Sequence, residues 1–387
     1  MDYSQILSQQ FNIKEEYAKN IITLLDDGNT IPFIARYRKE MHGSMDDQLI
    51  REFAEKLEYL RGLDKRRDEI RSLIDAQEKL TDEINLALDK AATLSELEDI
   101  YRPYRPKRKT RASIAKEKGL EPLANDILKQ EKGFDPSKSA VDYIDEEKGV
   151  TSVEDAIQGA MDIIAELVSD NAEIRKRIRN LTNANGVLVS VATDEEKDSV
   201  YKNYYDYKEP VKKIAGHRVL AVNRGEKEGF LKVSVETDSE KPLNSIFRAM
   251  ITDKNQLCSD IIREACTDAY QRLIYPSIER EVRNDLTDTA SENAMKVFAV
   301  NLKQLLMQPP VKGKTVLALD PGYRTGCKTA VVDSTGKVLD TTVIYPTHSD
   351  KKIQESKQTL LRLIKKHHVD IISIGNGTAS KETEMFT

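Results

Sequence analysis

The stretch TVLALDPGYRTGCKTAVVD, residues 315–333, contains two apolar runs that are separated by a Pro-Gly turn. A third such run, VLDTTVIYP, follows at 338–346, and a fourth, DIISIG, lies at 370–375. Between the last two, residues 350–367 carry apolar side chains at helical spacing. Short apolar runs bounded by turn residues are typical of strands, so this part of the chain is expected to fold as strand, strand, strand, helix, strand.

This order, with short turns between the first three strands, is typical of a sheet of the ribonuclease H type. In such a sheet the fourth strand lies parallel to the first, and their C-terminal ends meet at the same edge. Asn376 is therefore expected near Asp320, while Asp333 is expected at the opposite edge. We expect residues 312–387 to form this α/β domain, which is incomplete at its C-terminal end because the chain stops within the next helix.

Residues 1–308 have mainly helical patterns. Helices are expected near 13–25, 47–74 and 81–91, and in the stretch 277–308, which contains neither Gly nor Pro and would extend over roughly 48 Å. Capping boxes are expected at Thr93 with Glu96 and at Thr151 with Glu154. A small strand pair is expected from 187–192 and 230–236. The expected fold class is therefore mainly α and multi-domain, with a partial α/β domain at the end.

Composition limits the classes of function. The chain has 387 residues and a formal net charge of −5, so a nucleic-acid surface would have to arise from local clusters of its 60 basic residues. No apolar run approaches the roughly 20 residues needed to cross a bilayer, and MDYSQILSQQ at the start lacks the pattern of a signal peptide. We expect a cytoplasmic protein without a membrane partner.

The three cysteines, Cys258, Cys266 and Cys327, are expected to be reduced and buried. They form no CxxC pair, and no histidine lies at the spacing of a metal ligand. No metal site and no cofactor are therefore expected from them.

The most strongly basic stretch is YRPYRPKRKTR, residues 101–111, which has six positive charges in eleven residues. Its candidate nucleic-acid-binding residues are Arg102, Arg105, Lys107, Arg108, Lys109 and Arg111. Two prolines are expected to keep this segment extended, so that its cations can follow a phosphate backbone while Tyr101 or Tyr104 stacks on a base. The alternative is that these cations pair with acidic helices of the same chain.

Three other stretches have simpler interpretations. TIPFIARYRKE at 30–40 is expected to be a short helix with Phe33, Ile34 and Tyr37 inward. The tyrosines of YKNYYDY at 201–207 are expected to pack in a core. GYRTGCKT at 322–329 lacks the adjacent Gly-Lys pair and the following helix of a phosphate-binding loop, so nucleotide hydrolysis is not expected.

The chain resembles the Tex family of bacterial transcription accessory proteins. The stretches that carry the resemblance are TIPFIARYRKE (30–40), LEDIYRPYRPKRKTRASIAKEKGLEPLA (97–124), GHRVLAVNRGEKEGFLKV (216–233) and VKGKTVLALDPGYRTGCKTAVVD (311–333). The resemblance implies a helical Tex N-terminal region followed by a YqgF domain related to the resolvase RuvC and to ribonuclease H. Family members normally continue into helix-hairpin-helix elements and an oligonucleotide-binding barrel, so the chain looks like an N-terminal fragment.

In the resolvase and YqgF pattern Asp320 would be the first acid of a metal-dependent nuclease. The place of the second acid, after the fourth strand, is occupied by Asn376, whose amide carries no charge to offset that of a divalent cation. Glu382 and Glu384 on the next helix are the possible substitutes. We therefore expect Asp320 to be a vestigial feature of the fold, and the protein not to be an enzyme.

Three functions remain open at this point. The first is a non-catalytic scaffold for transcription that binds nucleic acid, with single-stranded RNA as the expected ligand and DNA as the alternative. The second is a metal-dependent nuclease that uses Asp320. The third is a helical adaptor that contacts proteins of the transcription machinery.

Overall fold

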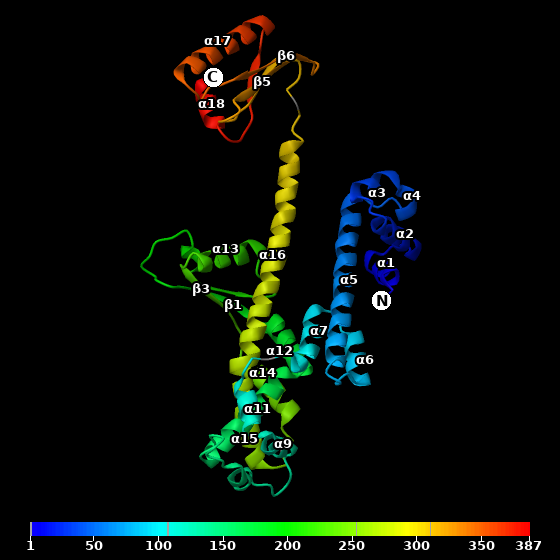
Figure 1. Ribbon diagram of the computed structural model, residues 1–387, viewed down its shortest axis with the longest axis vertical. Coiled ribbons are helices and arrows are strands. Elements are labelled where there is room, and N and C mark those ends of the chain that lie inside the picture. Colours follow the sequence, from blue (N-terminus) through cyan, green and yellow to red (C-terminus); the bar gives the residue numbers. More distant parts are fainter. Residues whose placement is uncertain (1, 107, 253, 310) are drawn as a thin grey trace. The chain divides into compact units, whose positions relative to one another are not determined.

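A computed structural model describes residues 2–106, 108–252, 254–309 and 311–387 (Figure 1). By its internal contacts the chain divides into two compact units, Met1–Met295 and Lys296–Thr387. This division falls within one long helix, so the expected boundary between 308 and 312 stays a prediction. None of the helices in the described ranges is long and apolar enough to cross a bilayer.

The first unit begins with four short helices that pack on the first half of a longer one. Their bounds are α1 Tyr3–Phe11, α2 Glu15–Asp26, α3 Ile31–Tyr37, α4 Lys39–His42 and α5 Asp47–Asp75. Ile21, Ile34 and Phe53 are fully buried in their common core. The helices expected near 13–25 and 47–74 are thus confirmed.

The inward position expected for Tyr37 is wrong. Ile34 of α3 is fully buried and Phe33 is half-buried, but Tyr37 is 59% exposed. The ring of Tyr37 lies against that of Phe33, at 5.3 Å between centroids, instead of entering the core. The short α3 therefore contributes mainly one large apolar side chain to the core.

The second half of α5 packs with two further helices, α6 Asp82–Lys90 and α7 Leu94–Tyr101. Thr93 caps α7 as expected, because its hydroxyl accepts a hydrogen bond from the Glu96 N–H, and the Glu96 carboxylate accepts one from the Ala92 N–H. A short 3-10 helix, η1 Arg102–Tyr104, follows α7 directly.

A larger helical core occupies the middle of the first unit. Its helices are α8 Arg111–Glu117, α9 Glu121–Lys129, α10 Pro136–Ala140, α11 Val153–Asp170, α12 Ala172–Asn185, α14 Glu240–Met250 and α15 Gln256–Asp268, with a 3-10 turn η2 at Val141–Tyr143. The cap expected at Thr151 is one residue too early, because α11 is capped by Ser152, whose hydroxyl accepts from the Asp155 N–H. Cys258 and Cys266 are buried free thiols in this core, and burial raises the pKa of Cys266 to about 12.

The expected strand pair is part of a three-stranded antiparallel sheet with the order β2-β1-β3. Its strands are β1 Val187–Ala192, β2 Asp206–Pro210 and β3 Leu231–Glu236, and η3 Lys202–Tyr204 and α13 Gly216–Lys227 complete this region. The third strand, β2, has the sequence DYKEP, with no aliphatic side chain. Tyr201 is buried against Phe230, and Tyr204 and Tyr205 pack partly on the same core.

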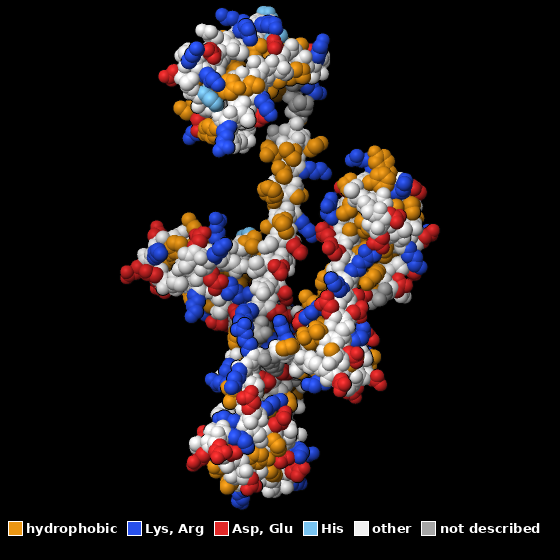
Figure 2. Space-filling view, in the orientation of Figure 1, with side chains coloured by type: hydrophobic (Ala, Val, Ile, Leu, Met, Phe, Trp, Pro, Cys, Tyr) orange, Lys and Arg blue, Asp and Glu red, His pale blue; other side chains and the backbone are white. Residues whose placement is uncertain are grey.

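A long helix, α16 Tyr275–Leu306, follows α15 through a π-helical segment at Ala269–Ile274. The helix expected over 277–308 is therefore confirmed with a shift of two residues at each end. The apolar side chains near its end are exposed and appear in orange along this part of α16 in Figure 2; they are Met295, Val297, Phe298, Val300, Leu302, Leu305 and Leu306.

The second unit contains the expected ribonuclease H-type sheet. Its elements are β4 Val316–Asp320, β5 Cys327–Val332, β6 Val338–Ile344, α17 Asp350–His367, β7 Ile371–Ile374 and α18 Ser380–Phe386. The strand order is β6-β5-β4-β7, with β7 parallel to β4 and the other pairs antiparallel. Leu360 and Leu363 of α17 pack with Leu317 and Leu319 of β4, so this helix covers one face of the sheet.

The turn into β5 depends on Gly326, whose φ is +77°. A Cβ atom there would lie 2.8 Å from the carbonyl oxygen of Ile344. We expect Gly326→Ala to destabilise β5 and β6 by roughly 2–3 kcal/mol, because it adds a backbone clash to an unfavourable φ. Hydrogen exchange of the amides in β5 and β6 measures this loss.

Gly336→Ala is the matched control, since Gly336 has a φ of +90° but no atom within 4 Å of the added Cβ. It should cost only about 1 kcal/mol, from its backbone conformation alone. Equal protection of β5 and β6 in the two variants would contradict the role of the close contact at Gly326.

Candidate nucleic-acid interface

The basic segment 101–111 is built from three short pieces of structure. Tyr101 ends α7, Arg102 and Pro103 lie in η1, and Arg111 is the first residue of α8. The expectation of an extended segment is therefore wrong for residues 102–104, because Pro103 fits within the first turn of a 3-10 helix as well as in extended chain. Beyond η1, Arg105 has an extended backbone, and Thr110 begins α8 with a capping box to Ser113.

The cations of the segment divide into paired and unpaired side chains. The Arg102 Nε atom lies 3.2 Å from Asp170, and the Lys109 Nζ atom lies 3.7 Å from Glu117. Arg105, Arg108 and Arg111 are exposed, and none of them forms an ion pair within the described part of the chain. Lys107 lies outside the described residues. The alternative of pairing within the chain thus holds for two of the candidate cations.

The two tyrosines of the segment are directed into the protein. Tyr101 is buried in the core of α5, α6 and α7, and Tyr104 is partly buried against the same core. The Arg66 guanidinium lies over the Tyr101 ring, 5.7 Å from its centroid. Tyr101 is therefore not available to stack on a base.

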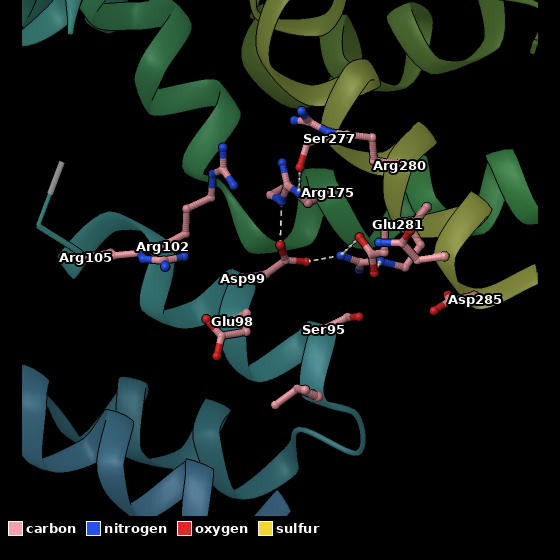
Figure 3. A pocket seen from close by; sticks show the side chains of 13 residues that line it. Ser95, Glu98, Asp99, Arg102, Arg105, Arg175, Ser277, Arg280, Glu281 and Asp285 are labelled. Atoms are coloured by element: carbon pink, nitrogen blue, oxygen red, sulfur yellow. Dashed lines mark hydrogen bonds and ion pairs between the residues drawn. The ribbon is translucent and has the colours of Figure 1, made fainter. Parts of the chain in front are cut away.

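Asp99, which lies two residues before the basic segment in sequence, belongs to a buried network of charges (Figure 3). Asp99 of α7 accepts hydrogen bonds from Arg175 Nε at 2.5 Å and from Arg179 Nη2 at 2.6 Å. Arg179 Nε also donates to Glu281 of α16 at 2.6 Å, and Arg175 Nη2 donates to the Ser277 hydroxyl at 3.1 Å. Two carboxylates and two guanidinium groups thus connect α7, α12 and α16.

Helical periodicity places the arginines of this network. Ile174 and Ile178 of α12 are buried in the large helical core, and the next residue in each case is Arg175 and Arg179. Because residues four apart lie on the same side of a helix, the two arginines point together toward α7 and α16. On α16, Ser277 and Glu281 have the same spacing and meet them.

The network forms one wall of a hollow of about 680 Å³ in the first unit. Its charged lining residues are Glu98, Asp99, Arg102, Arg105, Arg175, Arg179, Arg280, Glu281 and Asp285. Arg102 and Arg105 of the basic segment thus face the same space as the buried arginines of α12. This convergence is not among the features expected from the sequence.

The sequence contains a pattern that indicates the positions of Arg175, Arg179 and Asp99. The pattern IRKRIR at 174–179 places two arginines beside two isoleucines at the same helical spacing, which indicates arginines at the border of a core. Asp99, in LEDIY, likewise lies between apolar residues of α7. A carboxylate and two guanidinium groups in such positions are expected to pair when they are buried.

Asp320 is the last residue of β4, an inner strand of the sheet, and its side chain is exposed. Gly375 donates its N–H to the Leu319 carbonyl at 2.8 Å, so the end of β7 and Asn376 reach the same edge as Asp320, as expected. The register pairs Val316 with Val332, which puts Asp333 at the opposite edge. Glu382 accepts a hydrogen bond from the Tyr323 hydroxyl at 2.7 Å. The described residues contain no cluster of three His, Cys, Asp or Glu side chains suited to a metal ion.

The mainly helical first unit and the ribonuclease H-type sheet of the second unit define a multi-domain protein that is mainly α, with an α/β domain of the YqgF type. Three family models match the chain: Tex-like protein N-terminal domain at residues 1–75, Tex central region-like at 131–298 and Tex protein YqgF-like domain at 314–387. The chain belongs to the Tex family.

Curated relatives match the chain over its whole length. It is 45% identical to the uncharacterized protein YdcI of Bacillus subtilis, over 100% of this chain and 55% of the relative. It is 38% identical to the protein tex of Bordetella pertussis, over 99% of this chain and 51% of the relative. It is 32% identical to the human S1 RNA-binding domain-containing protein 1, over 100% of this chain and 40% of the relative. The chain spans about half the length of the curated relatives it matches, or less.

Asp99 is expected to be essential for the packing of α7 against α12. We expect Asp99→Asn to destabilise these helices by about 3–5 kcal/mol, because it leaves two buried guanidinium groups with one carboxylate between them. Hydrogen exchange of the amides in α7 and α12 is the measurement.

Asp26→Asn serves as the control, because Asp26 forms an exposed ion pair with Arg61 at 2.7 Å. Its removal should cost no more than about 1 kcal/mol. If the amides of α7 and α12 are as well protected from hydrogen exchange in Asp99→Asn as they are in Asp26→Asn, the network does not hold these helices together.

Proposed function

We propose that this chain is the phosphate-binding scaffold of a non-catalytic transcription accessory protein, and that its ligand is single-stranded RNA, with DNA as the alternative. The observation that carries the proposal is the set of three exposed arginines in the basic segment, Arg105, Arg108 and Arg111, which form no ion pair with any described residue. Guanidinium groups without an acidic partner are free to bind phosphate oxygens.

The names of two relatives support the proposal of a transcription accessory protein that binds nucleic acid. One relative, 39% identical to this chain, is the transcriptional accessory protein Tex of Neisseria gonorrhoeae, and the human relative is named for an S1 RNA-binding domain. The net charge of −5 makes non-specific attraction by the whole chain weak. Binding should therefore depend on the local cluster and on contacts to the backbone, which carry no sequence information.

The proposal that the YqgF domain is not catalytic rests on the lack of a second acid to accompany Asp320. Asn376 lies at the position where the second acid is expected, and the Glu382 carboxylate is hydrogen-bonded to Tyr323. A single carboxylate does not hold the two metal ions of a phosphodiester-cleaving site.

Binding of a fluorescent single-stranded RNA, followed by anisotropy over a salt series, tests the role of the segment. We expect the double variant Arg108→Gln/Arg111→Gln to have a log–log slope shallower by about 1.4, because each lost phosphate contact on a single strand removes about 0.7. The same series with single-stranded DNA ranks the two ligands.

The double variant Arg177→Gln/Arg248→Gln is the matched control. Both of its arginines are exposed, and neither forms an ion pair within the described ranges, so the change in net charge is the same. Equal slopes in the two double variants would show that Arg108 and Arg111 of the basic segment do not contact the RNA. No RNA binding at low salt would instead favour the adaptor that contacts proteins of the transcription machinery.

A second prediction concerns catalysis. With Mg²⁺ or Mn²⁺, the chain should leave a branched DNA, an RNA–DNA hybrid and a single-stranded RNA uncut, because the two-metal arrangement lacks its second acid. Electrophoresis of end-labelled substrates is the readout, with Asp320→Asn as the comparison. Cutting that disappears in Asp320→Asn would overturn the non-catalytic assignment and establish a nuclease.

A further inference from the structure

The hollow beside Asp99 has more positive charge than its own carboxylates balance. Asp99 and Glu281 are paired with Arg175 and Arg179, and Glu98 is paired with Arg66 at 2.7 Å. Arg105 and Arg280 also line the hollow, and neither forms an ion pair with a described residue.

The remaining acid of the hollow is Asp285. Burial raises the pKa of its carboxyl, and the neighbouring Glu281 and Asp288 raise it further. Even with Asp285 charged, the five arginines of the lining outnumber its four carboxylates.

One nitrogen of this lining is buried without a partner. Arg175 is 2% exposed, and its Nη1 atom has no hydrogen-bond acceptor among the described residues, while its Nε and Nη2 atoms are both bonded. Figure 3 shows this guanidinium between Asp99 and Ser277, on the same side of α7 as Arg102. A buried donor of a charged group that lacks an acceptor costs free energy until an acceptor reaches it.

Arg102 lines the same hollow as Arg175. Burial lowers the pKa of the Arg102 guanidinium, and the positive charge of Arg175 lowers it further, although Asp170 at 3.2 Å opposes this. Two guanidinium groups that face one hollow repel each other. An anion placed between them relieves the repulsion and accepts the free hydrogen bond at once.

We propose that this hollow is a phosphate site, in which Arg175 Nη1 donates to one oxygen while Arg102, Arg105 and Arg280 supply the surrounding positive charge. The group it takes is a backbone phosphate of the strand that crosses the basic segment, since Arg102 and Arg105 belong to both. The assignment of this phosphate to a nucleic-acid backbone rests on the proposed function. A free phosphate ion has the same chemistry, and a separate measurement distinguishes the free ion from the backbone phosphate.

Several features fit a phosphate better than other ligands. A divalent cation is excluded by the surplus of guanidinium groups, and the polar donors at the wall make an apolar ligand unfavourable. A tetrahedral oxyanion offers several acceptor oxygens to guanidinium forks that approach from different helices. The volume of about 680 Å³ leaves room for a phosphate together with water and the adjoining sugar.

Arg280→Gln tests the site without disturbing the buried network, because Arg280 is exposed and bonded to no described side chain. In the anisotropy salt series we expect its slope to become shallower by about 0.7, so that between 50 and 200 mM salt it loses about 2.6-fold less affinity than the unmodified chain. Arg177→Gln on α12 is the control, since it removes one exposed arginine that does not line the hollow.

A second arm titrates inorganic phosphate into the unmodified chain and into Arg280→Gln by calorimetry at constant ionic strength. A shallower RNA slope in Arg280→Gln alone, together with weaker phosphate binding, supports the site and its nucleic-acid source. RNA binding that depends on Arg108 and Arg111 but not on Arg280 overturns the site and leaves the proposed function standing. Arg280-dependent phosphate binding without RNA binding overturns the nucleic-acid source and the proposed function, and supports a site for free phosphate. If neither ligand binds, the site is overturned.

Discussion

The carboxylate of Asp99 is the point on which the first unit depends. It is 5% exposed, and both of its oxygens accept hydrogen bonds from arginines of α12. A buried charge is tolerated only when opposite charges and donors surround it, so α7 can dock on α12 in very few arrangements. The network therefore contributes more to the choice of one packing than to the total free energy of folding. The position of the basic segment follows, because that segment begins within three residues of Asp99.

The same network explains why a chain of negative net charge can present a cationic surface. The carboxylates of Asp99 and Glu281 are paired inside the protein with Arg175 and Arg179. The arginines beyond η1 are left with solvent on one side. The surface potential thus depends on which charged side chains are paired in the interior. The net charge of the whole chain describes it poorly.

The sequence was most informative where local patterns decide the structure. Alternation and turn residues located β4, β5 and β7, and the helix over 350–367 was confirmed at both ends. Local patterns failed where tertiary contacts decide. The strand β2 has an alternating burial that its polar sequence hides, and Tyr37 packs on Phe33 because the core beside α3 is filled by other residues. The hollow could not be foreseen for the same reason, since Asp99, Arg175 and Arg280 meet only in the folded chain.

The π-helical segment at Ala269–Ile274 has a consequence for how this chain tolerates change in length. It joins α15 to α16 without a loop, so the chain from the cap at Asn255 to Glu281 is helical throughout. Deleting one residue from such a segment turns everything after it by about 100° about the helix axis. Glu281 would then leave Arg179, and Arg280 would leave the hollow. Insertions and deletions are consequently far less acceptable here than in the loops, and the spacing between these positions is itself a structural constraint.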